Sequence, residues 1–211
     1  MQTKREPYLE RALASFILAT IMFIGFFAAA YSVSYINYQI ISSQNTLILA
    51  SITELDKVLA EFKCEQELLV SSSERLDEVA SKITLLEKRF GKKDSRVLEQ
   101  KKLYSELEYR HYQITLNFNG ACDSSYVTAL FFYSNINGLE EFQSERMGFI
   151  LTAFEREDAD RVMIYSFDYD LESETIASLV KEYNITEVPS VVVDNKVIYV
   201  RNLRDVEPYL N

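Results

Sequence analysis

The N-terminal part of the chain carries an uninterrupted run of apolar residues. Between Ala12 and Thr53 there is no Asp, Glu, Lys or Arg, and the 22 residues from Ala12 to Val33 are almost wholly apolar. A helix rising about 1.5 Å per residue needs roughly 20 such residues to cross the hydrocarbon core of a bilayer. The pattern predicts a transmembrane helix over residues 12–36, preceded by a short tail over residues 1–11.

The basic residues near this run lie on its N-terminal side. Lys4, Arg5 and Arg11 precede it, and the next basic residue is Lys57. The positive-inside rule predicts a single-pass cell-membrane protein, with its N-terminus in the cytoplasm and residues 40–211 outside. A signal peptide cleaved near Ala28–Ala30 is the alternative. Because the apolar run exceeds the roughly 7–15 residues of a signal peptide, we expect a retained anchor.

The next segment has the seven-residue period of an amphipathic or coiled-coil helix. Its repeating positions are Ile41, Ile48, Leu55, Phe62, Leu69, Leu76, Ile83 and Phe90. Gly91 suits a left-handed cap that ends this helix, and Asp94 can cap a second helix over residues 95–115. The pattern predicts an antiparallel helical hairpin, or coiled-coil stalk, over residues 37–118, with a bend at 71–73 and His111 in the helix interface. Its first helix, about 36 residues long, offers a surface for homo-oligomerisation.

The two cysteines are placed almost symmetrically about the predicted turn. Cys64 lies 28 residues before Lys92, and Cys122 lies 30 residues after it. An antiparallel return brings them to the same side of the hairpin, and disulfides persist outside the cytoplasm. We therefore expect a Cys64–Cys122 disulfide. Two free or redox-active thiols are the alternative.

Beyond the hairpin, runs of strand formers alternate with segments of helical period. Strands are expected at 127–133, 161–167, 190–193 and 197–200, and helices at 139–158, 172–184 and 203–210. Asp194–Lys196 reads as a hairpin turn between the last two strands. The order β-α-β-α-β-β-α predicts an α/β domain over residues 119–211.

Part of this domain resembles the thioredoxin superfamily. The segment Tyr183-Asn-Ile-Thr-Glu-Val-Pro-Ser-Val-Val-Val193 is similar to the family's proline-led third strand, and Ser134–Asn135 follow the first strand where the family places its redox motif. The resemblance covers residues 120–211 and implies a thioredoxin-like fold with a cis proline. It also implies that Val188 and Pro189 hold an extended peptide by strand pairing.

The sequence departs from this family at the redox motif. Residues 134–145 contain no cysteine, and Glu140 and Glu141 would oppose thiolate formation there. We therefore expect no catalytic residues and a role as a protein-binding or scaffolding module, with a protein or peptide partner. The alternative is a thiol–disulfide oxidoreductase or folding factor that uses Cys64 and Cys122.

The amino-acid composition argues against several classes of partner and site. The net charge of −10 argues against a nucleic-acid partner, and one histidine with two cysteines argues against a zinc site. Two acidic clusters are interpreted as helix caps and solvated surface rather than cation ligands. They are Glu155, Glu157, Asp158 and Asp160, and Asp168, Asp170, Glu172 and Glu174. We expect no metal and no cofactor.

Overall fold

The computed structural model describes residues 6–122, 124–136, 138–157, 161–200, 203–205 and 207–210. The chain divides into two compact units, residues 1–43 and 44–211, and each is described by itself. The described part of the first unit belongs to helix α1 (Glu6–Ala60), which begins inside the predicted tail. Residues 1–5 of that tail lie outside the described ranges. Its large apolar side chains, such as Phe16 and Phe27, are exposed. Among the described residues, α1 is the one helix that is both long enough and apolar enough to span a membrane.

The helical part of the second unit differs from the predicted hairpin. Helix α1 ends at Ala60, α2 spans Gln66–Phe90 and α3 spans Ser95–Ala121. The prediction of one unbroken first helix, about 36 residues long and ending at Phe90, is therefore wrong. The break lies at residues 61–65, not at the predicted bend over 71–73. The seven-residue period continues through the break, so the sequence pattern does not show it. Phe62 lies inside the break and still packs against Phe118, with ring centroids 5.2 Å apart.

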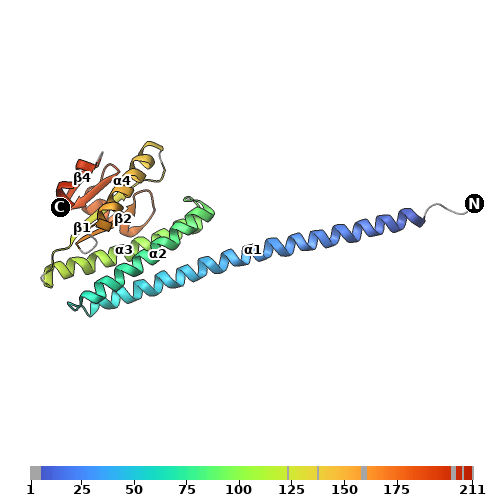
Figure 1. Cartoon of the computed structure of the whole chain (residues 1–211), viewed down its shortest axis with the longest axis horizontal. Helices are drawn as coiled ribbons and strands as arrows, with labels where there is room; N and C mark the ends of the chain where they lie inside the picture. Colours follow the sequence, from blue (N-terminus) through green and yellow to red (C-terminus); the bar gives the residue numbers. More distant parts are fainter. Residues whose placement is uncertain are drawn as a thin grey trace, which may run out of the picture. The chain divides into compact units, whose positions relative to one another are not determined.

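Contacts between the helices set their directions. Asn45 and Asp56 of α1 bind Gln100 and Arg110 of α3, so these two helices run parallel. Helices α2 and α3 run antiparallel and lie along each other (Figure 1). Gly91 ends α2 at a φ of 92°, a conformation that glycine adopts without a Cβ clash. The ψ of Gly91 is 148°, so it ends the helix at positive φ but not in the predicted left-handed helical conformation. Asp94 caps α3 by accepting the backbone N–H of Arg96, as predicted.

The remaining elements form a mixed sheet and the helices that cover it. The strands are β1 (Val127–Tyr133), β2 (Val162–Asp168), β3 (Ser190–Val193) and β4 (Lys196–Tyr199). Helix α4 (Gly138–Glu157) joins β1 to β2, and α5 (Glu174–Glu182) follows β2. A 3₁₀ turn (Leu203–Asp205) and α6 (Glu207–Leu210) come last. These ranges agree with the predicted elements to within two residues where the structure describes them.

The four-stranded sheet has the order β2-β1-β3-β4. Strand β1 pairs in parallel with β2 and antiparallel with β3, and β3 pairs antiparallel with β4. The β3–β4 turn is formed by Asp194 and Asn195, both at positive φ, as a type I′ hairpin turn requires. The described chain is therefore a mixed α/β protein with a mixed sheet and a long N-terminal helix.

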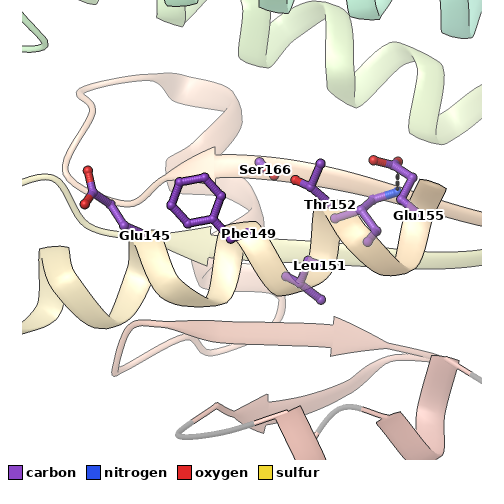
Figure 2. Close-up of a pocket in the computed structure, with 8 residues that line it drawn as sticks. Glu145, Phe149, Leu151, Thr152, Glu155 and Ser166 are labelled. Atoms are coloured by element: carbon purple, nitrogen blue, oxygen red, sulfur yellow. Dashed lines mark hydrogen bonds between the residues drawn. The ribbon is translucent and has the colours of Figure 1, made fainter. Parts of the chain in front are cut away.

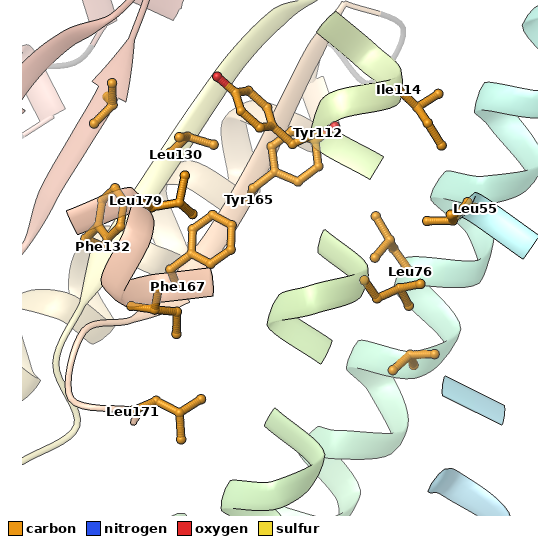
Figure 3. Packing of buried hydrophobic residues seen from close by; sticks show 14 of the residues in the cluster. Leu55, Leu76, Tyr112, Ile114, Leu130, Phe132, Tyr165, Phe167, Leu171 and Leu179 are labelled. Atoms are coloured by element: carbon orange, nitrogen blue, oxygen red, sulfur yellow. The ribbon is translucent and has the colours of Figure 1, made fainter. Parts of the chain in front are cut away.

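Each face of the sheet packs into its own hydrophobic cluster. Alternation along β1 sends Leu130 and Phe132 to one face, where they join Tyr165, Phe167 and residues of the helices, as in the cluster of Figure 3. Ala129 and Phe131 face the other way, toward Met147 and Leu151 of α4. Apolar burial on both faces fixes the register of β1, because a one-residue slip would exchange the two sets.

Candidate functional site

The sheet brings the predicted peptide-binding residues to the end of β1. Phe132 pairs with Ser190 across the β1–β3 ladder, so the chain leaving β1 at Ser134 meets the chain entering β3 at Val188 and Pro189. The Val188–Pro189 peptide is cis, Val188 is half-buried and Pro189 is buried. Peptide binding at Val188 and Pro189 stays a prediction.

A polar network occupies the position where the resemblance places a redox motif. Ser134 Oγ donates to Asp170 Oδ2 at 2.6 Å, and the Asn135 backbone N–H donates to the same oxygen at 3.0 Å. Asn135 Nδ2 donates to Asp168 Oδ2 at 2.7 Å. The Ser134 N–H is taken by Ser144 Oγ of α4 at 3.0 Å. These groups fix the start of α4 through bonds within the chain.

A buried ion pair supports this network from the helical side. Lys101 Nζ of α3 lies 2.6 Å from Asp168 Oδ2 and 3.4 Å from Glu87 Oε1 of α2. Burial acts to lower the pKa of Lys101, but Tyr133, Asp168 and Glu87 outweigh it, and the pKa is raised above its ordinary value. Asp168 is only 5% exposed, so its interpretation as solvated surface is wrong. Asp170, from the same acidic cluster, also accepts hydrogen bonds in this network.

The cysteines lie at the opposite end of β1. Cys64, in the break between α1 and α2, forms a disulfide with Cys122, which follows α3, and their Cα atoms are 5.4 Å apart. The predicted disulfide is confirmed, although Cys64 is not helical as the hairpin implied. Seven residues of β1, roughly 20 Å of extended chain, separate this end from Ser134. The disulfide is therefore remote from the position of a family redox motif.

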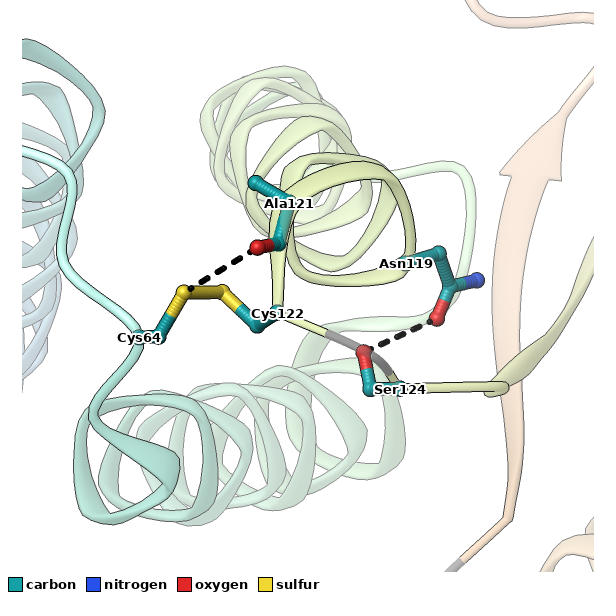
Figure 4. The surroundings of a disulfide bond; sticks show 5 residues. All are labelled: Cys64, Asn119, Ala121, Cys122 and Ser124. Carbon is teal, nitrogen blue, oxygen red and sulfur yellow. Dashed lines mark hydrogen bonds between the residues drawn. A yellow bond between two sulfur atoms is a disulfide. The ribbon is translucent and has the colours of Figure 1, made fainter.

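Side chains around the disulfide order the passage from α3 into β1 (Figure 4). Asn119 donates to the Tyr126 carbonyl at 2.7 Å and accepts the Tyr126 N–H at 2.9 Å. Its Oδ1 also accepts Ser124 Oγ at 3.4 Å. On the other side, Cys64 Sγ contacts the Ala121 carbonyl at 3.6 Å. The disulfide and Asn119 together fasten the helices to the sheet.

The free edge of β2 is closed by two glutamates that the sequence interpretation did not single out for this role. Glu108 Oε1 of α3 accepts the Ser166 N–H at 2.9 Å, and Glu155 Oε1 of α4 accepts the Ile164 N–H at 2.9 Å. Burial raises the pKa of both carboxyls, against the lowering effect of these N–H groups. Since an edge strand with free N–H groups invites strand pairing, the glutamates protect it.

One signal in the sequence could have revealed this buried polar line. On α3, positions at helical spacing carry polar side chains that the fold buries: Lys101, Ser105, Glu108 and Thr115. Spacing of i, i+4 and i+7 places such residues on one helix face. A helix between two packed layers has a second inward face, and the apolar period alone does not show it.

A pocket of about 290 Å³ lies beside this strand edge (Figure 2). Helix α4 and β2 line it with apolar, hydroxyl and acidic groups: Glu145, Gly148, Phe149, Leu151, Thr152, Glu155, Ile164 and Ser166. Glu145, Phe149 and Thr152 project from one side of α4, and Leu151 projects from the other. Asp158 and Asp160 of the same predicted acidic cluster lie outside the described residues. Among the residues described, no group of three His, Cys, Asp or Glu is placed to hold a metal.

His111 lies in the predicted interface between α2 and α3, and it also reaches the sheet, which was not predicted. Its Nδ1 is 2.8 Å from the Tyr165 hydroxyl of β2, and its Nε2 is 3.2 Å from Ser73 Oγ of α2. Thr115 Oγ1 lies 2.9 Å from the same Tyr165 hydroxyl. Burial lowers the pKa of His111 to about 4, so the imidazole is neutral at physiological pH. The arrangement is a hydrogen-bonded core contact.

Comparison with known proteins adds no family to this picture. No protein-family model matches the chain, and no curated protein matches it.

Proposed function

We propose that this chain is a single-pass membrane protein whose C-terminal domain is thioredoxin-like, redox-inactive and used outside the cytoplasm as a protein-binding or scaffolding module. The observation that carries the proposal is the polar network at the end of β1. Ser134 and Asn135, which lead from β1 toward α4, donate to Asp168 and Asp170, and residues 134–145 supply no cysteine for thiol chemistry.

The membrane assignment is supported by the first unit. Phe16, Phe23 and Phe27 are exposed along a helix with no charged residue between Ala12 and Thr53. Leaving such side chains in water costs about 25 cal/mol for each Å² of apolar surface, whereas lipid covers them. The basic residues before this run support a cytoplasmic N-terminus.

The thioredoxin-like assignment is supported by the order of elements after α3. Strand, helix, strand, helix, two strands and a short final helix follow one another, with a proline leading β3. Val188 is half-buried at the end of the sheet, next to the chain that leaves β1. A half-buried apolar residue beside an extended segment is suited to hold a peptide by strand pairing.

Topology and redox activity form the first pair of tests. Protease added to spheroplasts should degrade residues 40–211 and leave the anchor. The full chain in detergent should reduce insulin no faster than the uncatalysed background. A protected C-terminal domain contradicts the orientation, and turnover that disappears in Cys122→Ser contradicts redox inactivity.

Photocrosslinking tests the binding role. A photoreactive amino acid at Glu187, exposed and adjacent to Val188, should capture a protein in intact membranes. Val188→Asp should abolish the adduct, whereas Val70→Asp should not, because Val70 is half exposed on α2. An adduct insensitive to Val188→Asp contradicts peptide binding at this position.

One observation favours the alternative oxidoreductase. Cys64 is exposed and directly precedes Glu65, the N-cap of α2, and helix N-termini favour thiolates. Glu65 and Glu67 act in the opposite direction, since nearby carboxylates disfavour a thiolate. If the Cys64–Cys122 disulfide is partly reduced in a glutathione buffer set to the reduction potential of the exterior compartment, the result would support the oxidoreductase. Resistance to that buffer would support a structural bond.

A further inference from the structure

Helix α4 exposes a line of large apolar side chains. Leu139, Phe142 and Phe149 are 70%, 63% and 78% exposed, and their spacing of three and seven residues places them on one side of the helix. The opposite side of α4 is buried through Met147 and Leu151. Single exposed apolar residues need no explanation, but two phenylalanines aligned with a leucine form a continuous apolar surface.

An acidic line runs beside the apolar one. Glu141, Glu145 and Glu155 follow each other at spacings of four and ten residues, with Thr152 between the last two. Glu145 and Glu155 also line the pocket of about 290 Å³, whose wall includes Phe149 (Figure 2). The helix therefore presents an aromatic surface and, beside it, a pocket with one carboxyl group at each end.

The charge around this pocket is predominantly negative. Residues 138–157 hold five glutamates against Arg146 and Arg156. Asp77 of α2 adds to the negative potential at Glu155. The Glu155 carboxyl is itself engaged by the Ile164 N–H, and burial raises its pKa, so it is not the anchor for a cation. The chain itself shows that an ammonium group suits the rim: Lys92 Nζ, from the turn after α2, forms an ion pair with Glu145 and lies 3.9 Å from Glu141 Oε1.

We propose that the outer side of α4 binds a basic amphipathic helix of a partner protein. The apolar face of that helix packs on Leu139, Phe142 and Phe149, and a lysine or arginine on its flank lies at Glu145 on the rim of the pocket. Aromatic residues dominate the buried centres of protein interfaces, and complementary charge selects the partner. This surface is separate from Val188–Pro189, and its test rests on the proposed membrane anchor but not on the proposed peptide binding at Val188.

The test measures binding of two labelled peptides to the full chain in lipid nanodiscs. The first is an 18-residue amphipathic helix with leucines on one face and lysines beside them. The second carries glutamates in place of those lysines. Fluorescence anisotropy should show salt-sensitive binding of the lysine peptide alone.

Variants on and off the surface make the test specific. The double variant F142A/F149A should weaken binding of the lysine peptide at least about tenfold. Leu85→Ala should leave it unchanged, because Leu85 is 63% exposed on α2. Glu145→Lys should weaken the lysine peptide and strengthen the glutamate peptide, a gain that misfolding cannot produce.

Three results would overturn the proposal. They are equal binding of the two peptides, unchanged binding in F142A/F149A, and loss in Val188→Asp with none in F142A/F149A. Sedimentation of the chain in detergent tests whether a second copy of the chain, rather than a partner protein, occupies this surface. A dimer that F142A/F149A dissociates would also overturn the assignment to a basic helix.

Discussion

Glu108 Oε1 accepts the backbone N–H of Ser166 at 2.9 Å, so a helix side chain completes the hydrogen bonding of the β2 edge. Glu155 does the same for Ile164 from the other flank. The two carboxyls lie at an edge strand that another chain would otherwise extend. The sheet is thereby closed on the β2 side.

Replacing Glu108 tests this edge closure. Glu108→Ala leaves the Ser166 N–H without an acceptor and should lower the free energy of unfolding by about 2 kcal/mol. Glu108→Gln retains an acceptor for this N–H and should lower the free energy of unfolding much less. Urea unfolding of the full chain in detergent, followed by far-UV circular dichroism, measures both. Equal losses in the two variants contradict the edge-capping role.

The pH dependence of the Glu108 effect has a defined sign. Burial raises the pKa of Glu108 well above its ordinary value of 4.5, so folding favours the protonated acid. The stabilisation is complete below pH 4.5 and is lost as the pH rises through the raised pKa. Glu108→Gln should therefore become more stable relative to the natural chain as the pH increases. A constant difference across the pH range would exclude this linkage.

His111 should make the fold sensitive to acid. Burial lowers the pKa of this imidazole from 6.5 to about 4, so the unfolded chain binds the proton first as the pH falls. Stability is therefore complete above pH 6.5 and falls by roughly 3 kcal/mol by pH 4. His111→Gln should remove this dependence. Because the chain has one histidine, the imidazole proton resonances in an NMR titration report the pKa directly.

The Lys101–Asp168 pair should behave as a unit. Lys101→Met leaves Asp168 buried with only neutral donors and should destabilise the fold by roughly 3–5 kcal/mol. Adding Asp168→Asn should recover part of that loss, because no buried charge then remains. A double-mutant cycle measured by urea unfolding gives the coupling energy between Lys101 and Asp168. Additive losses would show that the two side chains act independently.

The disulfide should contribute to stability through the loop that it closes. For the sequence separation of 58 residues, the chain-entropy relation gives about 4 kcal/mol. Cys64→Ser should then lower Tm by roughly 10 °C for a unit of this size. The double variant C64S/C122S is the control for a stray thiol. Intact mass with and without reductant should differ by two hydrogens, and an unchanged mass contradicts the bond.

Local patterns were sufficient for several features. The absence of charge between Ala12 and Thr53 indicates a helix able to cross a membrane, because charged groups are costly in hydrocarbon. Gly91 and Asp94 mark the helix ends by chain geometry alone. The strand at 127–133 follows from its run of apolar strand formers. The Cys64–Cys122 pairing follows from the count of residues on either side of one turn.

The remaining features depend on contacts between segments distant in sequence. The break after Ala60 preserves the heptad, and its local sequence contains no glycine or proline; packing of Phe62 on Phe118 and the disulfide hold it. Lys101 and Glu108 read as ordinary helix-surface charges until β2 brings Asp168 and the Ser166 N–H to them. Periodicity specifies which side of a helix is buried against one neighbour. The tertiary structure decides what lies against the other side, and there the buried charges of this protein find their partners.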